Sequence, residues 1–331
     1  MSLLRSVAAA TALEAGLGAA LLAALGLGGA WFQWLDAINH FAPFILLLAL
    51  LGGGLGVAVL RGRARRLVLA LAFVGLAVPL GLMAPDLFAR ARTAMFPAPA
   101  GARPLKLLTY NVWTENIDIP KTADLILAAD ADVVTLQENN ALEEVRDRLA
   151  ARYPYRVSCE PNWRCGLSIL SKRPLTNGAF QARPTPEDEY AFQGVWATTT
   201  APDGSPITFV TTHFAWSVPP GAQARQRAGL AMRVKALAAD HPFVTGDLNL
   251  TPWSFALRGV DGELAPATRR TRALFSWPAI TARLNRPFPA PFAPIDHIYA
   301  PATWRTVKVE RLARGGSDHY GVLATFTRDG G

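Results

Sequence analysis

The stretch Phe243-Val244-Thr245-Gly246-Asp247-Leu248-Asn249 is a short apolar run that ends in two oxygen-rich side chains. Such a run is typical of a buried β-strand that stops at a cleft. Asp247 and Asn249 are two residues apart, so on an extended backbone they point to the same side. That layout suits holding a phosphate, a hard metal ion or an attacking water. A strand followed by an Asx-stabilised turn has the same pattern, and the rest of the chain must distinguish the two.

Other predicted strands in the same region also begin or end with polar side chains. Each has an ordinary explanation when taken alone, namely a turn cap, a solvated edge charge or a core histidine. Together they are hard to explain as independent turns, because this region also holds four of the five histidines of the chain. The polar residues at these strand ends are Asn111, Glu138, His213, Asp296, Asp318 and His319.

Several of the predicted strands follow one another directly, with helices between only some of them. We expect helices over 120–129, 141–151 and 222–239. This order favours two packed sheets with helices outside, an α+β sandwich, over a strictly alternating parallel sheet. We place this soluble domain at 105–328, after a Pro/Ala/Gly-rich linker at 96–104.

Three apolar stretches precede this domain, at about 7–30, 41–60 and 67–84. Each is long enough to cross about 30 Å of hydrocarbon as a helix. A single such stretch is compatible with a buried core helix, and the first with a signal peptide, but neither explains all three. The sequence therefore predicts a multi-pass membrane region over 1–95.

The short loops predict the orientation of these spans. The segment 61–66 carries four arginines, whereas 31–40 has no lysine or arginine and contains Trp31 and Trp34. Arginine-rich short loops stay in the cytoplasm, so we expect a cytoplasmic N-terminus and an extracytoplasmic soluble domain. Three arginines after the third span argue mildly against this orientation, but long domains cross the membrane largely regardless of charge.

The two cysteines, Cys159 and Cys165, lie close together in a Pro-containing segment. In an oxidising compartment a local disulfide is the natural interpretation, and two free thiols are the alternative. A metal site would need more ligands nearby, and no histidine is close.

Net charge alone does not indicate nucleic-acid binding. The chain has a formal charge of +8 and 51% hydrophobic residues, and beyond residue 98 it holds 26 basic and 22 acidic residues. That mildly basic balance tolerates a phosphate-bearing substrate but is no nucleic-acid footprint.

The strand-end residues predict a particular chemistry. Carboxylate and amide oxygens are the ligands that Mg²⁺ or Mn²⁺ selects, and no Cys/His cluster indicates tetrahedral zinc. His213 and His319 are suited to donating hydrogen bonds to phosphoryl oxygens or to moving protons, and Asp296 to orienting one of them. With no covalent-nucleophile motif present, attack by a water held by Asp247 and Asn249 is the simplest mechanism.

The ordered set of these motifs resembles the endonuclease/exonuclease/phosphatase family. The resemblance spans about 104–328 and rests on Tyr110-Asn111, Leu136-Gln137-Glu138, Thr212-His213, Gly246-Asp247-Leu248-Asn249, Ile295-Asp296-His297 and Ser317-Asp318-His319. It implies a four-layer α/β/β/α sandwich of the DNase I type and Mg²⁺-dependent cleavage of a phosphate ester or anhydride.

Carried over to this chain, the resemblance also implies residue roles. Glu138 would be the principal metal ligand, with Asn111 and Asp318 beside it. Asp247 and Asn249 would position water and phosphate. The remaining roles fall to His213 and His319, which would contact phosphate or shuttle protons, and to Asp296, which would support a histidine. One or two metal ions are equally compatible with the pattern.

The substrate class follows less directly. The layout is similar to bacterial membrane-bound members of the family associated with teicoplanin resistance, which implies a polyprenyl-pyrophosphate or phospholipid headgroup substrate at the inner membrane. An extracytoplasmic nuclease and a membrane-tethered binding module without catalysis are the alternatives, and the oligomeric state stays open. Five aromatic residues in loops are candidates for lining an apolar entrance to the site, although ordinary packing onto the core also explains them: Trp113, Trp216, Trp253, Phe275 and Trp277. Three arginines are candidates for contacts to anionic groups, although a solvated basic loop also explains them: Arg269, Arg270 and Arg272.

Overall fold

The computed structural model describes residues 3–92, 101, 103–159, 165–181, 191–218, 221–238, 241–281 and 285–328. The chain divides into two compact units. The first, here called the helical unit, comprises 3–91 and two short downstream segments, 217–218 and 251–259. The second, here called the sheet unit, comprises the other described residues. Of the predicted linker 96–104, only 101, 103 and 104 lie among the described residues.

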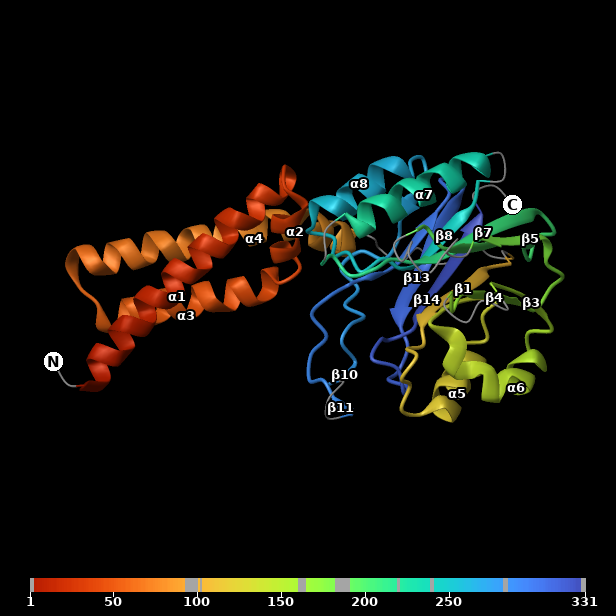
Figure 1. The fold of residues 1–331 in the computed structure, drawn as a ribbon, viewed down its shortest axis with the longest axis horizontal. Coiled ribbons are helices and arrows are strands. Elements are labelled where there is room, and N and C mark those ends of the chain that lie inside the picture. The colour runs from red at the N-terminus through yellow and green to blue at the C-terminus, as the bar shows by residue number, and fades with distance from the viewer. Residues whose placement is uncertain are drawn as a thin grey trace. The chain divides into compact units, whose positions relative to one another are not determined.

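Three long apolar helices form most of the helical unit (Figure 1). They are α1 (Leu3–Leu27), which a short 3₁₀ turn η1 (Gly28–Ala30) extends, α3 (Ala42–Val59) and α4 (Gly62–Arg92). Each is long and apolar enough to cross a membrane. Their contacts are made by small residues: a Cβ added at Gly52 would lie 2.6 Å from the backbone nitrogen of Gly16, and one at Gly75 would lie 2.7 Å from Ala19 Cβ. Small side chains allow such close helix packing, while large apolar side chains face outward.

The expected spans coincide with these helices, with different ends: α1 begins earlier, α3 is one residue shorter at each end, and α4 is longer at both ends. The largest difference is α4, which begins at Gly62 rather than near residue 67. Its first residues are mainly Arg and Ala, which favour helix, so the helix includes the arginine-rich segment. Two prolines inside α4, Pro79 and Pro85, do not end it.

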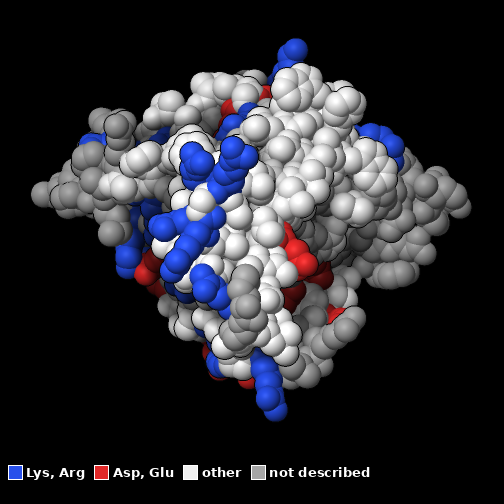
Figure 2. All heavy atoms as spheres, turned by 90° about the vertical axis from the view of Figure 1, so that its left-hand side faces the viewer, with Lys and Arg blue, Asp and Glu red and all other residues white. Residues whose placement is uncertain are grey.

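The two ends of the helical unit differ in chemistry. Arg5 donates Nη2 to Val59 O at 3.3 Å, so the start of α1 lies beside the end of α3, next to the arginine-rich segment 61–66 where α4 begins. Basic side chains gather on the face shown in Figure 2, which looks onto this end. The other end carries the short helix α2 (Gln33–Asn39) and the exposed aromatic residues Trp31, Phe32 and Trp34.

The sheet unit contains two six-stranded sheets. The first has the order β13-β14-β1-β2-β4-β3 and the second β5-β6-β7-β8-β12-β9. The strands of the first are β13 (Trp304–Arg311), β14 (Val322–Arg328), β1 (Leu105–Asn111), β2 (Val133–Gln137), β4 (Ser168–Ser171) and β3 (Tyr155–Ser158). Those of the second are β5 (Thr176–Gln181), β6 (Gly194–Thr200), β7 (Pro206–His213), β8 (Phe243–Asp247), β12 (Asp296–Ala300) and β9 (Thr268–Arg269).

The sheets pack face to face around one apolar core, to which both contribute buried residues such as Leu107, Ile169, Phe209 and Phe243. A second cluster lies between the first sheet and α5 (Ile119–Ala129). In Figure 1, α5 and α6 (Arg146–Ala150) lie on one side of the sheets and α7 (Ala222–Ala236) on the other. The predicted α+β sandwich is therefore confirmed.

A buried polar layer also joins the two sheets. Thr245 Oγ1 donates to Thr135 Oγ1 at 2.9 Å, and Gln137 Nε2 donates to Thr211 Oγ1 at 2.9 Å. Thr135 and Gln137 lie on β2, whereas Thr211 and Thr245 lie on β7 and β8. Because buried hydrogen bonds need partners in one fixed place, this layer sets the strands of the two sheets against each other.

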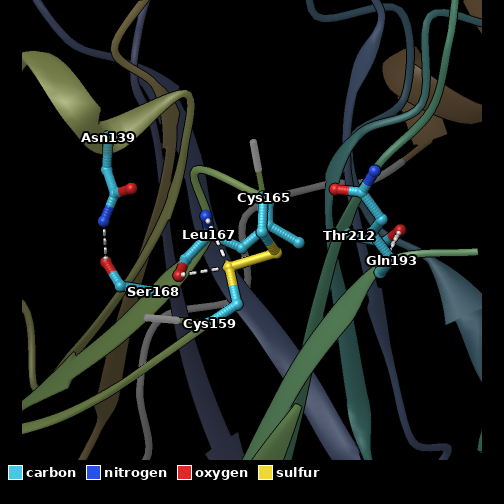
Figure 3. The surroundings of a disulfide bond; sticks show 7 residues. All are labelled: Asn139, Cys159, Cys165, Leu167, Ser168, Gln193 and Thr212. Atoms are coloured by element: carbon cyan, nitrogen blue, oxygen red, sulfur yellow. Dashed lines mark hydrogen bonds between the residues drawn. A yellow bond between two sulfur atoms is a disulfide. The ribbon is translucent and has the colours of Figure 1, made fainter. Parts of the chain in front are cut away.

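Cys159 and Cys165 form the predicted disulfide (Figure 3). The Leu167 N–H donates to Cys159 Sγ at 3.3 Å, and both cysteines are buried in the core between the sheets. The bond therefore secures the chain where it enters β4. The residues between them, 160–164, lie outside the described part of the chain.

One local prediction differs from the structure, and two elements were not predicted. The segment 141–151 is not one amphipathic helix but a 3₁₀ stretch η2 (Asn139–Val145) followed by the short α6. The 3₁₀ stretch follows directly on Glu138, whose φ is +51°. The helix α8 (Phe255–Glu263) and the hairpin of β10 (Ile280–Thr281) and β11 (Arg286–Pro287) were not predicted.

Candidate active site

Strand register brings the predicted site residues together. Asn111 ends β1 opposite Gln137 on the parallel strand β2, and His213 ends β7 opposite Asp247 on the parallel strand β8. The antiparallel strand β12 begins at Asp296, which also lies opposite Asp247. In the first sheet β14 runs antiparallel to β1, with Thr109 opposite Val322, so the residues just before β14 lie near the end of β1. One end of the sandwich therefore collects polar side chains from both sheets.

Glu138 follows β2 directly and is partly accessible. Its Oε1 accepts a hydrogen bond from Asn111 Nδ2 at 3.0 Å, and its Oε2 accepts from the Thr114 N–H and hydroxyl at 3.0 and 3.1 Å. Burial raises the pKa of this carboxyl, but the charge of His213 and these hydrogen bonds outweigh burial and hold the pKa below its usual range. Glu138 is therefore a carboxylate at neutral pH.

Backbone geometry places Glu138 at this position. Its φ of +51° turns the chain sharply at the end of β2. Gly166, with a φ of +59°, packs against the same turn, and a Cβ added there would lie 3.2 Å from Glu138 Cα. The Asn139 N–H donates to Gly166 O at 3.0 Å, while Asn139 Nδ2 donates to Ser168 Oγ at 2.7 Å (Figure 3).

Asn111 joins the two sheets at the site. Its Nδ2 donates to Glu138 Oε1 and to Asp247 Oδ2, each at 3.0 Å, while its Oδ1 accepts from the Trp113 N–H at 3.0 Å. The amide therefore bridges two carboxylates through its nitrogen. Its predicted role as a metal ligand stays a prediction, since the ligand atom would be the oxygen that faces Trp113.

Asp247 is fully buried and held by its own turn. Its Oδ1 accepts the Asn249 N–H at 2.9 Å, and Asn249 Nδ2 donates to Phe214 O at 2.8 Å. Gly246 has a φ of +145°, and a Cβ there would lie 1.9 Å from Thr212 O, so only glycine fits between β7 and the turn. Burial raises the pKa of Asp247 to about 6, although His319 and His213 counteract it.

His213 faces this group from the end of β7. Its Nε2 lies 3.5 Å from Asp247 Oδ2, 3.8 Å from Glu138 Oε1 and 3.4 Å from Asn249 Nδ2. About a quarter of the side chain (27%) is exposed, against 5% for His319. His213 is therefore the histidine that solvent or a substrate reaches more easily.

Asp296 and His319 form a buried pair behind the site. His319 Nδ1 lies 2.9 Å from Asp296 Oδ2, and its Nε2 lies 3.5 Å from Asp247 Oδ2 and 3.9 Å from Asp318 Oδ1. Burial alone lowers the pKa of His319, but the negative charges of Asp296, Asp247 and Asp318 raise it well above its ordinary value. His319 is therefore held as an imidazolium with Nε2–H toward the carboxylates.

Asp318 has one oxygen bound and one without a hydrogen-bond partner. Trp277 Nε1 donates to Asp318 Oδ2 at 3.0 Å. The other oxygen, Oδ1, is buried and has no hydrogen-bond partner among the described residues. Burial raises the pKa of this carboxyl, with the charge of Glu138 contributing and His319 opposing.

This oxygen indicates how a hard cation fits the site. This buried carboxylate oxygen accepts no hydrogen bond, and its ion-pair partner His319 is 3.9 Å away, so a divalent cation would supply the direct contact that it lacks. The donor set at this end of the sandwich is rich in oxygen, as Mg²⁺ prefers, and Glu138 and Asp318 offer carboxylate oxygens to it. A tighter group of possible ligands is Asp247, Asp296 and His319, whose ligand atoms lie within 4.8 Å of one another. We interpret that group as a hydrogen-bonding relay, because His319 Nδ1 already contacts Asp296.

All eight predicted catalytic and metal-binding residues thus lie in one contact network, and further described residues support it. The structure adds Thr114 on Glu138 and Trp277 on Asp318. Ser317 Oγ donates to Asn111 O at 2.7 Å and accepts the His319 N–H at 3.0 Å. His297 Nε2 donates to Leu250 O at 2.8 Å, so this histidine is a buried structural residue. Ser317 and His297 adjoin predicted site residues in sequence, whereas no pattern pointed to Thr114.

Some of the aromatic and arginine residues predicted to bind substrate are buried structural residues, whereas Trp216 is exposed. Trp253 is fully buried, whereas Trp216 is 55% exposed and meets Trp277 edge to face at 5.4 Å. Arg269 is buried and pairs with Asp261 at 3.0 Å, and Arg270 donates Nη2 to Trp304 O at 3.1 Å. These two arginines hold loops together, which leaves them poorly placed to attract an anionic substrate.

Comparison with known proteins agrees with this geometry. Residues 108–319 match the family model described as "Endonuclease/Exonuclease/phosphatase family". No curated protein is significantly similar to the chain in sequence.

Solved structures share the fold at low sequence identity. D. rerio TDP2 complexed with single-strand DNA product has a TM-score of 0.54 and 18% identity, over 68% of this chain and 99% of that one. A family protein from Bacteroides thetaiotaomicron has a TM-score of 0.53 and 16% identity, covering 69% and 99%. One from Beutenbergia cavernae DSM 12333 has a TM-score of 0.52 and 19% identity, covering 68% and 72%.

The family match spans the strands that carry the site, and the similar structures share their arrangement. The chain belongs to the endonuclease/exonuclease/phosphatase family.

Proposed function

We propose that the protein is a membrane-anchored, divalent-metal-dependent phosphohydrolase that cleaves a phosphodiester or pyrophosphate by attack of water. Enzymes of this family are hydrolases that act on phosphodiester bonds, and they generally use divalent metals. The observation that carries the proposal is the buried Asp318 Oδ1, which accepts no hydrogen bond from the described residues and lies in the same network as Glu138 and Asp247. A binding module that had lost catalysis would have no need to keep a buried carboxylate oxygen without a hydrogen bond beside a protonated histidine.

Two carboxylates, Glu138 and Asp318, are the residues that would hold the cation, with Asn111 beside them. When bound, Mg²⁺ or Mn²⁺ neutralises charge on the phosphoryl oxygens and stabilises the leaving oxygen. Thr114 and Trp277 keep the two carboxylates in place through their hydrogen bonds. Such supporting contacts fix the orientation of ligands before the cation arrives.

Asp247 and His319 provide the protein's part of the hydrolysis. Asp247, with a pKa near 6, is suited to accept a proton from the attacking water at neutral pH. Asn249 orients the same water through its amide beside His213. His319 presents a charged Nε2–H, which donates a hydrogen bond to a phosphoryl oxygen as negative charge develops there.

The helical unit supports a lipid-linked or other envelope phosphate as the substrate. Its three helices are long enough to span a bilayer and expose large apolar side chains. Anchoring confines the enzyme to the membrane surface, where lipid-linked phosphates reach far higher local concentrations than soluble ones. The exposed Trp216 beside Trp277, which binds Asp318, offers apolar contact next to the site.

An extracytoplasmic location at the bacterial inner membrane is part of the same proposal. Five arginines lie at one end of the helical unit, Arg5 and the four at 61–66, and such residues favour the cytoplasmic side. Segment 251–259 of the downstream chain belongs to the other end of this unit, where α2 lies. The disulfide Cys159–Cys165 also suits an oxidising compartment.

The test is hydrolysis by the full-length protein in detergent, with a panel of undecaprenyl pyrophosphate, phospholipids and plasmid DNA. We expect turnover of a lipid phosphate with Mg²⁺ or Mn²⁺, loss of turnover with EDTA and loss in Glu138→Gln. The matched control is Asp203→Asn, for which we expect unchanged turnover. Asp203 lies in the turn before β7, whereas His213 is at the far end of the same strand.

Plasmid cleavage without lipid turnover would instead indicate the extracytoplasmic nuclease. Absence of turnover on every substrate, with wild type and Glu138→Gln alike, would indicate the non-catalytic binding module. The panel therefore separates all three functions.

A further inference from the structure

We propose that Asp36 and His40 are positioning residues for the active site. They lie on α2 and just after it, between the first two apolar helices, and they fix the backbone segment that leaves the site after Asn249. This inference rests on the proposed hydrolase function for its kinetic test, and it also has a test that needs no activity.

Asp36 caps a helix more than two hundred residues away in sequence. Its Oδ1 accepts the Phe255 N–H at 2.9 Å, and its Oδ2 accepts the Ala256 N–H at 2.8 Å. These are the first two amides of α8, which have no partner within the helix. A carboxylate at a helix N-terminus is also favoured by the helix dipole. Asp36 is only 5% exposed, so losing it would leave two buried donors unpaired.

The N-terminus of α8 also has a local cap, Ser254, so Asp36 is not needed simply to start the helix. Ser254 Oγ accepts the Leu257 N–H at 3.2 Å, the usual contact of an N-cap serine. Ser254 Oγ also donates to Thr251 O at 2.8 Å. The serine is therefore sufficient to start α8, whereas Asp36 determines where the start of α8 lies relative to α2.

His40 holds the residue at which this segment begins. Its Nδ1 accepts the Thr251 N–H at 3.3 Å and lies 2.9 Å from Thr251 Oγ1. A backbone N–H only donates, so Nδ1 is an acceptor and the imidazole is neutral. Consistent with this, burial lowers the pKa of His40 to about 4, although Asp36 counteracts it.

The short helix α2 is itself fixed against the end of α1. Asn39 Nδ2 donates to Gly26 O and to Asp36 Oδ1, both at 2.9 Å. A Cβ added at Gly29 would lie 2.6 Å from Asp36 Cα, so glycine is required for this approach. Asp36 is thus oriented by the membrane-spanning part of the helical unit and not by a loose loop.

The held segment follows directly on the catalytic turn. Thr251 is two residues after Asn249, whose N–H binds Asp247 Oδ1. Between them, Leu250 O accepts His297 Nε2 at 2.8 Å. Only two peptide units therefore separate Thr251 from the Asn249 amide, and we expect a displacement of Thr251 to alter both of these contacts. Because small misplacements of catalytic groups cost much rate, Asp36 and His40 are expected to act on kcat.

The experiment compares two pairs of variants of the full-length protein in detergent. Asp36→Ala removes the remote cap, whereas Asp36→Asn keeps an acceptor that is favoured at a helix N-terminus. His40→Ala removes the Thr251 contact, whereas His40→Asn keeps an oxygen near the position of Nδ1. Asp203→Ala is the control, because Asp203 also accepts two hydrogen bonds, from the Ser205 N–H and hydroxyl, in a turn away from the site.

We expect kcat to fall about tenfold to a hundredfold in each alanine variant with KM little changed, and to recover at least partly in the asparagine variants. Hydrogen exchange at the Leu248 and Asn249 amides is expected to speed up in the alanine variants but not in Asp203→Ala.

Wild-type kcat in both alanine variants, or no recovery in either asparagine variant, would overturn the proposal. Unchanged exchange at these two amides would overturn it independently of any activity. A wild-type protein without turnover refutes the proposed function instead, and the exchange measurement then decides the positioning role.

Discussion

The Nδ1 of His319 lies 2.9 Å from Asp296 Oδ2, and both side chains are buried. This contact fixes the imidazole ring so that Nε2 faces Asp247. We expect Asp296→Asn to lower kcat by about a hundredfold, because the neutral amide no longer stabilises the imidazolium and hydrolysis depends on that charge. His319→Ala is expected to abolish turnover. The measurement is steady-state hydrolysis of the substrate identified in the panel, and near-wild-type kcat in Asp296→Asn would exclude a role for the pair.

Removal of the Thr114 hydroxyl tests how Glu138 is held. In Thr114→Val the backbone N–H still donates to Glu138 Oε2, but the second hydrogen bond, at 3.1 Å, is lost. We expect the Mg²⁺ concentration for half-maximal activity to rise about tenfold, with kcat at saturating Mg²⁺ nearly unchanged. A metal titration of activity measures this. Thr114→Ser keeps the hydroxyl and is the matched control.

Trp277→Phe separates the hydrogen bond of the indole from its apolar contacts. The phenyl ring keeps an aromatic group beside Trp216 but cannot donate to Asp318 Oδ2. Apparent Mg²⁺ affinity should weaken about tenfold, as in other sites that lose a contact to a metal ligand. Isothermal titration with Mg²⁺ measures the affinity without substrate. An affinity equal to that of the wild type would show that Trp277 serves only packing.

The disulfide is expected to act on stability rather than catalysis. Cys159→Ser combined with Cys165→Ser removes a constraint on the unfolded chain, and we expect the free energy of unfolding to fall by about 2 kcal/mol. Kinetic constants of the folded protein should not change, because no predicted catalytic residue contacts either sulfur. Denaturant unfolding of wild type and the double variant, with and without reductant, gives the difference. A reductant-insensitive wild type would contradict the prediction.

Acid sensitivity of the fold is expected to depend in part on Asp130. Lys172 lies 2.6 Å from Asp130 Oδ1, and Arg152 also binds this oxygen. The hydrogen bonds from Lys172 and Arg152 lower its pKa to about 2. A lowered pKa means that this stabilisation is present above the unfolded value near 4 and is lost as pH falls toward 2.

Because Asp130 is about half exposed, we expect its contribution to be about 1 kcal/mol or less. Asp130→Asn retains a residue that tolerates the left-handed end of α5 and should lose this part of the pH dependence. Unfolding measured at pH 3 and pH 6 tests it. An identical difference between the two pH values in both proteins would contradict the assignment.

The site could be predicted from sequence because its chemistry lies at strand ends. Glu138, His213 and Asp247 each follow a short apolar run, and local pattern is enough to find such runs. The order of the motifs then identified the fold, which the register of β1 with β2 and of β7 with β8 explains.

Long-range contacts could not be predicted in the same way. Nothing in the local sequence links Asp36 to Phe255 or Trp277 to Asp318, because these pairs depend on how separate segments pack. The helix predicted over 141–151 was wrong in its first half. Its periodicity is helical, but residues up to Val145 form the 3₁₀ stretch η2, and amphipathic periodicity alone does not distinguish the two kinds of helix.

The cap on α8 has a consequence for biosynthesis. Asp36 precedes Phe255 by 219 residues, so Asp36 leaves the ribosome long before its partner is made. Chains fold broadly from the N-terminus during synthesis at about 5–20 residues per second, which places the two events about ten seconds or more apart. In that interval the carboxylate of Asp36 has no helix to cap. The contacts that complete the helical unit can therefore form only late in translation. By then the strands up to β8, which carry most of the catalytic residues, have already been synthesised.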